Sequence, residues 1–217
     1  MKRVVAHDVA WVPDFRPRRQ APISRVVALM EQHDLFGEAP TGSPEGMVYR
    51  PDFLSLAEEQ AMLERLADLP FKPFEFQGFT GKRETVSFGW SYRFDGSGLA
   101  PAEPMPDWLL PLRAKAAAFA GLPPEAIEHA LLIRYGPGAG LGWHRDRPVF
   151  GDVIGVSLLA PAPLRFRLKE GAKWRRFTLE VAPRSLYLLR GPARDQWEHS
   201  IPPVEAPRYS MTFRTLR

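Results

Sequence analysis

The second half of the 217-residue chain is a succession of short strand-like segments, and this succession restricts the possible folds more than any other feature. Turn sequences such as GPGAG and KEGAK separate the segments, and no stretch of helical periodicity and helix length interrupts them. Short strands without alternating helices are typical of an antiparallel sandwich, jelly roll or barrel. The six candidate strands are HALLIRY (129–135), DVIGVSLLA (152–160), PLRFRL (163–168), RRFTLEV (175–181), RSLYLLRG (184–191) and PRYSMTFRTL (207–216).

Helices are expected before this block. Ser55 is a good N-cap residue for one helix, and a second helix is predicted over residues 106–122. The aromatic and basic segment 71–94 is predicted to form strands joined by a Gly-containing loop. The expected fold class is therefore mainly β with flanking helices (α+β), and we see neither an internal repeat nor a second domain.

The first 46 residues differ in composition from the rest of the chain. They are rich in Pro, Arg and Gly, with one helical patch over 23–36. We therefore predict an N-terminal arm or extension over residues 1–46 and a single domain over residues 47–217.

Composition excludes some kinds of site and favours one kind of partner. The chain has no cysteine, which excludes disulfides, thiolate metal sites and a cysteine nucleophile. Of the 29 basic residues 23 are arginine, whose planar fork suits phosphate and carboxylate, although a coding bias explains this excess equally well. No apolar run is long enough for a signal peptide or a bilayer span. We expect a cytoplasmic monomer without a membrane partner.

The last strand candidate has one polar and one apolar face. Side chains alternate between the two faces of a strand. The polar face carries Arg208, Ser210, Thr212 and Arg214, and the other carries Tyr209, Met211 and Phe213. If the polar face points into the molecule, its two arginines require an anion.

A candidate metal site accompanies this strand. In an extended chain His144 and Asp146 point to the same side, so an imidazole and a carboxylate can share one ion. The pair alone is a weak signal, because HRDR is equally compatible with a charged surface loop. His199, one of only five histidines, is a candidate third ligand. Two histidines and one carboxylate form the facial triad of non-haem Fe(II) oxygenases, which leaves positions for a 2-oxo acid and oxygen.

The run RYGPG…HRD…H…RYSMTFR resembles the AlkB family of Fe(II)/2-oxoglutarate dioxygenases, over about residues 83–217. The family pattern has Tyr-x-Pro-Gly before His-x-Asp, then a distal His, then Arg-x-Asn-x-Thr-x-Arg. The resemblance implies a double-stranded β-helix (jelly-roll) core and Fe(II), 2-oxoglutarate and O₂ as cofactors. It implies that His144, Asp146 and His199 bind the metal. It also assigns cosubstrate contacts to Tyr135 and Arg208 at the distal carboxylate, to Arg214 near the metal and to Ser210.

Two positions depart from the family pattern. Where the family has an asparagine two residues before the tyrosine, this chain has Ile133, and Ser210 replaces the asparagine of the closing motif. Serine can still donate a hydrogen bond and isoleucine cannot. We therefore expect cosubstrate binding to be weakened or rearranged.

The activity implied by the resemblance is oxidative demethylation of alkylated nucleic acid bases, as in DNA repair, with DNA or RNA as substrate. The segment GKRETVSFGWSYRF offers Lys82 and Arg83 for phosphate. Candidate aromatic contacts to the base are Phe88, Trp90, Tyr92 and Trp143. Alternating aromatic residues on a strand more often serve packing. Our substrate-binding prediction comprises Arg83, Trp90, Tyr92 and Trp143.

Three alternatives remain open from the sequence. The same chemistry could act on a protein side chain or a small molecule. The chain could instead be a catalytically weak nucleic-acid-binding protein on the same fold. A cupin-like sandwich that uses a metal without 2-oxoglutarate is a further possibility, but the pair Arg208 and Arg214 argues against it.

Overall fold

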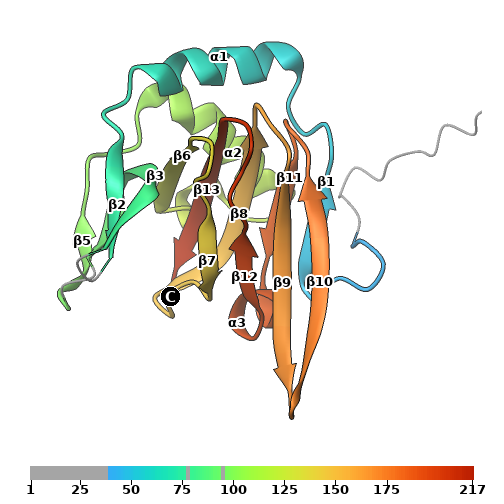
Figure 1. The fold of residues 1–217 in the computed structure, drawn as a ribbon. Helices are drawn as coiled ribbons and strands as arrows, with labels where there is room; N and C mark the ends of the chain where they lie inside the picture. Colours follow the sequence, from blue (N-terminus) through green and yellow to red (C-terminus); the bar gives the residue numbers. More distant parts are fainter. Residues whose placement is uncertain (1–38, 77–78, 94–95) are drawn as a thin grey trace, which may run out of the picture. The chain divides into compact units, whose positions relative to one another are not determined.

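The computed structural model describes residues 39–76, 79–93 and 96–217, and antiparallel sheets dominate this part of the chain (Figure 1). A seven-stranded sheet has the order β1-β11-β8-β13-β6-β3-β2, a four-stranded sheet the order β10-β9-β12-β7, and β4 pairs with β5. The helical patch predicted over 23–36 lies outside the described residues, as does most of the predicted arm. No helix in the described part is long and apolar enough to cross a membrane.

The large sheet consists of β1 (Met47–Arg50), β2 (Lys72–Phe76), β3 (Phe79–Phe88), β6 (His129–Tyr135), β8 (Phe150–Leu158), β11 (Leu186–Leu189) and β13 (Arg208–Leu216). The small sheet consists of β7 (Leu141–His144), β9 (Ala162–Glu170), β10 (Lys173–Val181) and β12 (Glu198–Ile201). The remaining pair is β4 (Trp90–Arg93) and β5 (Gly98–Pro101). The helices are α1 (Leu56–Ala67), α2 (Leu110–Phe119) and α3 (Gly191–Asp195), with 3₁₀ turns at Asp107–Leu109 and Pro124–Ala126.

Helix α1 begins where its N-cap was predicted. The Ser55 hydroxyl accepts a hydrogen bond from the Glu58 amide, and the Glu58 carboxylate accepts one from the Ser55 amide, so a complete capping box starts the helix. Glu58 also forms an ion pair with Lys115 of α2, with Nζ and Oε1 2.9 Å apart. The capping box therefore fixes where α1 starts, and its acidic residue also joins the two helices.

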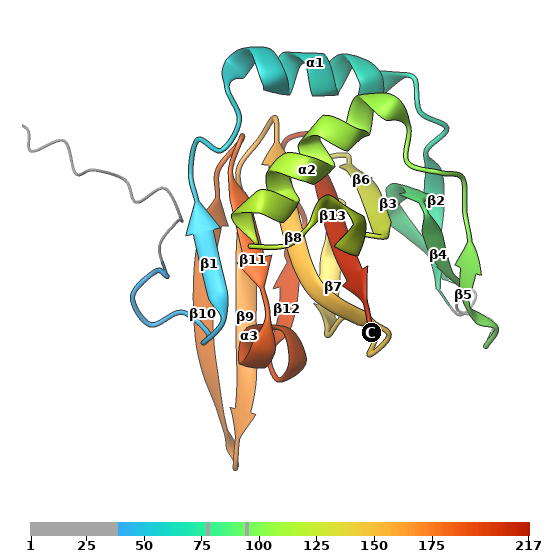
Figure 2. The ribbon, with the colours of Figure 1, turned by 180° about the vertical axis from the view of Figure 1, so that it is seen from behind.

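One face of the large sheet packs against α1 and α2, which lie over it in Figure 2. Met211 and Phe213 of β13 point to this side and are fully buried, with Leu132 of β6 and Val156 of β8 beside them. Because side chains alternate along a strand, the residues between these hydrophobic ones face the opposite way.

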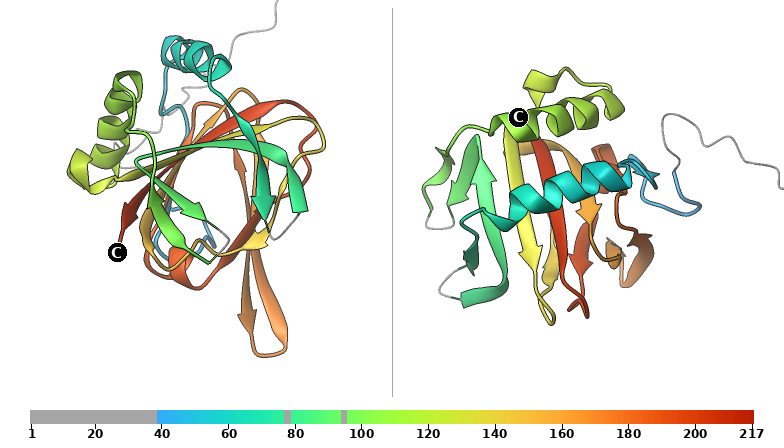
Figure 3. Two further views of the ribbon diagram at one scale, coloured as in Figure 1. Left: turned by 90° about the vertical axis from the view of Figure 1, so that its left-hand side faces the viewer. Right: turned by 90° about the horizontal axis from the view of Figure 1, so that it is seen from above.

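The opposite face of the large sheet looks at the small sheet, and the two curve round a common interior (Figure 3, left). Leu164 and Phe166 of β9 close this interior from the small sheet together with Ile201 of β12. The prediction of a mainly β fold with a jelly-roll core is confirmed.

Three elements of the small sheet and its surroundings were not predicted. Strands β7 and β12 mix apolar with polar residues. Each has only four residues, which is too short for an alternation of apolar and polar side chains to be visible in the sequence. They exist as strands because they pair with each other and β12 also pairs with β9. Helix α3 has five residues, less than two turns, and a segment of that length shows no helical period.

Candidate metal centre and cosubstrate site

The polar face of β13 points into the interior between the two sheets. All four of its polar side chains are buried, and the exposed fraction of Arg208 is 1%. Strands β6 and β8 flank β13 on either side, so its polar residues have no access to solvent along the sheet. The two arginines of this strand are therefore inside the protein, as an anion-binding role requires.

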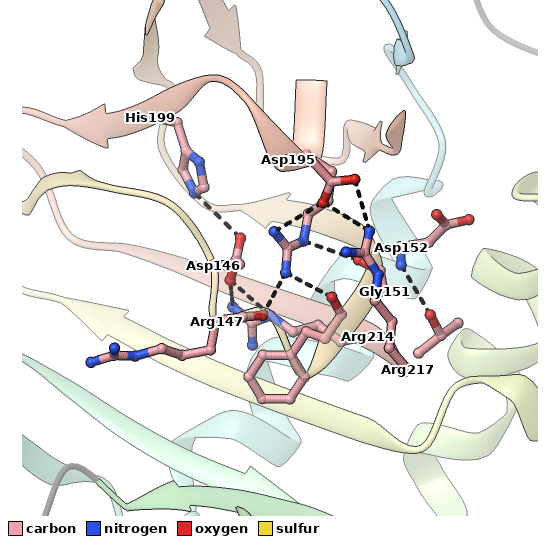
Figure 4. A network of polar contacts seen from close by, with 11 residues as sticks. Asp146, Arg147, Gly151, Asp152, Asp195, His199, Arg214 and Arg217 are labelled. Atoms are coloured by element: carbon pink, nitrogen blue, oxygen red, sulfur yellow. Dashed lines mark hydrogen bonds and ion pairs between the residues drawn. The ribbon is translucent and has the colours of Figure 1, made fainter. Parts of the chain in front are cut away.

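The three predicted metal ligands meet at the edge of the small sheet. His144 of β7 and His199 of β12 are direct cross-strand partners, which puts their imidazoles on the same side with ring centroids 4.3 Å apart. Asp146 lies two residues beyond the end of β7, and its Oδ2 is 3.7 Å from Nε2 of His199 (Figure 4). One donor atom from each of the three residues lies within 4.8 Å of the others.

Arg214 holds the carboxylate of Asp146 in place. Its Nε and Nη2 lie 3.1 Å and 2.8 Å from Oδ1 (Figure 4). Oδ2 is buried, and no residue in the part of the chain that the structure describes forms a hydrogen bond to it. Burial alone would raise the pKa of Asp146, but Arg214 and the two histidines outweigh it and keep the pKa well below its usual range. Asp146 is therefore a fixed carboxylate with one oxygen left for a ligand.

Both histidines are in the form that binds metals. Burial, with a smaller effect of the neighbouring His144, lowers the pKa of His199 to about 3, and burial also lowers the pKa of His144. His144 Nδ1 lies 2.9 Å from the carbonyl oxygen of Gly142, which can only accept, so this nitrogen carries the proton. The lone pair of His144 Nε2 is then available to a metal.

His129 belongs to this site, although we assigned no function to it from the sequence. It is buried at the start of β6, its Nδ1 lies 3.3 Å from Nη1 of Arg214, and its ring stacks on Phe150 at 4.9 Å. Burial and the charge of Arg214 lower its pKa to about 3, so it is neutral and accepts from the guanidinium. Along β6, His129 and Tyr135 are six residues apart and therefore lie on the same face of the strand. This alternation could have revealed from the sequence that both face the interior.

Arg208 occupies a different environment at the other end of β13. Its Nη2 donates to the hydroxyl of Ser157 at 2.8 Å, and its guanidinium carbon lies 5.0 Å from the ring centre of Tyr135. The remaining nitrogens, Nε and Nη1, are buried and have no hydrogen-bond partner among the described residues. Burial lowers the pKa of Arg208, but a guanidinium stays charged in proteins. A buried cation with free donors points to an anionic ligand.

Tyrosines surround this cation. Tyr187 of β11 lies over Gly155, where a Cβ would come within 2.1 Å of its ring, so only glycine leaves room for it. Burial raises the pKa of Tyr187 to about 12 and also raises that of Tyr135, so both phenols are neutral. Ser210 is buried between Ile133 and Ser157 in the sheet register. The surroundings of Arg208 thus offer hydroxyl groups from serine and tyrosine.

These features fit Fe(II) and 2-oxoglutarate. The donor set of two neutral imidazoles and one carboxylate suits a divalent transition metal, and the free oxygen of Asp146 lacks a ligand. The unpartnered nitrogens of Arg208 suit the distal carboxylate of a dicarboxylic acid.

A cavity of about 720 Å³ opens beside the metal ligands. Three of the four predicted substrate residues, Arg83, Tyr92 and Trp143, are on its wall, along with His144, Asp146 and Arg214. Trp90 is not on this wall, and Phe88 packs against the core under the helices. Arg83 lies over the ring of Phe74 at 3.8 Å. The cavity is therefore lined by basic and aromatic residues next to the candidate metal.

The loop after Asp146 is held by a buried arginine that we did not predict. Arg194 of α3 donates to the carbonyl oxygens of Arg147 and Phe150 at 2.7 Å and of Gly151 at 3.0 Å. Arg147 in turn lies 5.1 Å from the ring centre of Tyr92 on the cavity wall. Arg194 thus positions one side of the cavity.

Comparison with known proteins identifies the family. Residues 46–216 match the family model described as the 2OG-Fe(II) oxygenase superfamily. The chain is 32% identical over 112 residues to a zebrafish protein named "Probable RNA/DNA demethylase ALKBH6", covering 52% of this chain and 45% of that protein. It is 30% identical over 165 residues to the bovine mitochondrial alkB homolog 7, an alpha-ketoglutarate-dependent dioxygenase, covering 72% and 67%. The match thus spans less than half the length of the zebrafish relative.

Solved structures show the same fold. The structure of OsALKBH1 superimposes with a TM-score of 0.65 at 16% identity, covering 80% of this chain and 97% of that one. The family is shown by the family model over most of the chain and by the bovine relative. The chain belongs to the 2OG-Fe(II) oxygenase superfamily and, within it, to the AlkB-like proteins.

Proposed function

We propose that this protein is an Fe(II)/2-oxoglutarate-dependent dioxygenase that removes alkyl groups from nucleic acid bases. The observation that carries the proposal is the combination, in one interior, of the His–Asp–His cluster with the buried and incompletely bonded guanidinium of Arg208. Fe(II), 2-oxoglutarate and O₂ are the cofactors of this superfamily.

The residues of the chain have distinct roles in this reaction. His144, Asp146 and His199 would hold Fe(II), which when bound supplies the oxidation of a substrate C–H bond to C–OH at the expense of 2-oxoglutarate and O₂. Arg208 binds the distal carboxylate and so orients the cosubstrate. Arg214 orients Asp146. On an N-methyl group, the hydroxylated product loses formaldehyde and leaves the unmethylated base.

Nucleic acid is the substrate class that the cavity favours. Its wall combines the cation Arg83 with the aromatic rings of Tyr92 and Trp143, which suits a planar base attached to phosphate. The zebrafish relative is named as an RNA/DNA demethylase. We assign Arg83, Tyr92 and Trp143 to substrate contact, whereas the position of Trp90 outside the wall gives it no direct role there.

The test is turnover of single-stranded oligonucleotides that each contain one N-methylated base, with Fe(II), 2-oxoglutarate and ascorbate. We expect loss of one CH₂ unit by mass spectrometry, equimolar succinate and formaldehyde, and no product with His144→Ala. Methylated peptides are assayed in parallel. Demethylation of peptides alone would retain the dioxygenase but overturn the nucleic acid substrate, and 2-oxoglutarate turnover absent from every mixture would overturn both.

A further inference from the structure

The outward-facing side of the small sheet carries an unusual set of side chains. Direct cross-strand partners point to the same side of a sheet, and the register pairs Arg176 with Arg167, Trp174 with Lys169, and Ser200 with Arg165. The side chains between them, such as Leu164 and Phe166, are buried in the interior. The same outward side also carries Thr178, Glu180 and Glu198. We call its basic and aromatic residues the basic face: Trp143, Arg165, Arg167, Lys169, Trp174 and Arg176.

Aromatic and cationic groups alternate across the basic face. The guanidinium of Arg167 lies 4.4 Å from the ring centre of Trp143 and 4.5 Å from that of Trp174. Arg165 lies 5.1 Å from the ring of Trp143. Both tryptophans are partly exposed, and each has a ring held in a defined orientation by a neighbouring cation. Such rings can stack on unpaired bases without a large cost of ordering.

The positive charge of the basic face is only partly balanced. Arg167 forms an ion pair with Glu198 at 2.5 Å, but Arg167 is also directly opposite Arg176, and like charges at opposed positions destabilise a sheet. Arg165 bonds to the hydroxyl of Ser200 at 3.2 Å. Within the described part of the chain, Arg165, Lys169 and Arg176 have no carboxylate partner. A polyanion would relieve this repulsion.

The basic face is continuous with the candidate active site. Trp143 directly precedes the metal ligand His144, and it is on the wall of the cavity while also contacting Arg165 and Arg167. From there the face continues onto β9 and β10, which extend beyond the neighbouring strands (Figure 1). A chain that leaves the cavity past Trp143 meets the basic face next.

We propose that the basic face binds the single-stranded polynucleotide that flanks the base held in the cavity. This inference rests on the proposed function and adds to it that the nucleic acid substrate is single-stranded. Arg165, Lys169 and Arg176 contact phosphates, and Trp174 stacks on an unpaired base. Unpaired bases are required because a ring on a sheet surface reaches the plane of a base only when that base is outside a duplex.

Binding is measured by fluorescence anisotropy of the full chain with an unmodified 12-mer, single-stranded or in a duplex, at several salt concentrations. We expect tighter binding of the single strand. The double variant Lys169→Ser/Arg176→Ser should reduce the slope of log K against log salt by about 1.4, because each phosphate contact to a single strand contributes about 0.7. Trp174→Ala should weaken binding roughly tenfold without changing the slope.

The matched control is Arg65→Ser on α1, an exposed arginine that is not part of the basic face, which should leave both quantities unchanged. A second measurement compares turnover of the same methylated base in a trinucleotide and in a 12-mer. For Trp174→Ala and the double variant we expect a raised KM for the 12-mer and a smaller increase for the trinucleotide, which has only one nucleotide on each side of the methylated base.

The results separate this inference from the proposed function. If the 12-mer is demethylated but the variants bind and react like wild type, the basic face is not the binding surface, although the function stands. If the duplex binds as tightly as the single strand, the proposed single-stranded state of the substrate is wrong, although the function stands. If neither oligonucleotide is a substrate while 2-oxoglutarate still binds, the nucleic acid substrate fails and the basic face fails with it.

Discussion

Arg208 and Arg214 are on the same face of the same strand, and both are buried, but their surroundings differ. Arg214 is bonded by the protein itself, with Asp146 at 2.8 Å and His129 at 3.3 Å. Arg208 donates from Nη2 to Ser157, and its Nε and Nη1 have no hydrogen-bond partner among the described residues. The difference indicates that Arg214 orients the proposed metal ligand Asp146, whereas Arg208 keeps donors for the proposed cosubstrate.

The largest expected effect is a difference in stability between a variant of Arg214 and a variant of Arg208. In metal-free and cosubstrate-free protein, Arg214→Met should lower the free energy of unfolding by about 3–5 kcal/mol, because it leaves Asp146 buried without its partner. Arg208→Met should change it by less than about 1 kcal/mol or increase it, because it removes a buried charge for which the described residues supply no counter-ion. Urea unfolding in EDTA measures both. Equal destabilisation by the two substitutions would remove the distinction.

The environment of Arg214 also predicts a pH dependence. The pKa of His129 is about 3 in the folded protein, below the usual 6.5 of an unfolded chain. As the pH falls, His129 therefore takes up a proton in the unfolded state before it does so in the folded state. The stability that neutral His129 contributes is complete above pH 6.5 and is lost as the pH falls towards 3. At pH 5 this residue alone should reduce the free energy of unfolding by about 2 kcal/mol relative to pH 7.

The measurement is urea unfolding of the metal-free protein between pH 5 and pH 7. The slope of the free energy of unfolding against pH gives the number of protons taken up on unfolding. The substitution His129→Leu should lower this number by up to one, whereas the buried His144 and His199 still contribute to it. An unchanged slope in the variant would mean that His129 already titrates normally in the folded protein.

The smallest expected effect concerns the hydrogen bond from Arg208 to Ser157. Ser157→Ala removes the hydroxyl that accepts from Nη2. Because Arg208 keeps its charge, we expect 2-oxoglutarate affinity to fall only by roughly three- to tenfold, the worth of one hydrogen bond. Isothermal titration of the Mn(II)-loaded protein with 2-oxoglutarate measures this. A loss as large as that of Arg208→Met would show that Ser157 itself binds the cosubstrate.

Much of this site could be predicted from local sequence pattern. The alternation of Arg208, Ser210, Thr212 and Arg214 identified an inward polar face because a strand has a period of two. The spacing of His144 and Asp146 likewise identified two groups on one side. Such features depend on neighbours along the chain, and the structure brings them together as expected.

What could not be predicted depends on the pairing of distant segments. Nothing in the residues around His199 shows that it is opposite His144, because a four-residue strand has no readable period and its register is fixed by β7 and β9. Arg194 looked like an ordinary turn residue, and only the approach of the loop after Asp146 makes it a buried donor to three carbonyls. The basic face likewise exists only once β7, β9 and β10 are adjacent.

The most direct test of the central claim is an anaerobic titration of the Fe(II)-loaded protein with 2-oxoglutarate, following the visible charge-transfer band. We predict a saturable band in wild type and, in Arg208→Met, an apparent dissociation constant at least about 30-fold higher, because a buried carboxylate loses its charged partner. Iron content and unfolding by urea confirm that the variant is loaded and folded. A band that saturates at the same 2-oxoglutarate concentration in both proteins would contradict the assignment of Arg208 as the cosubstrate anchor.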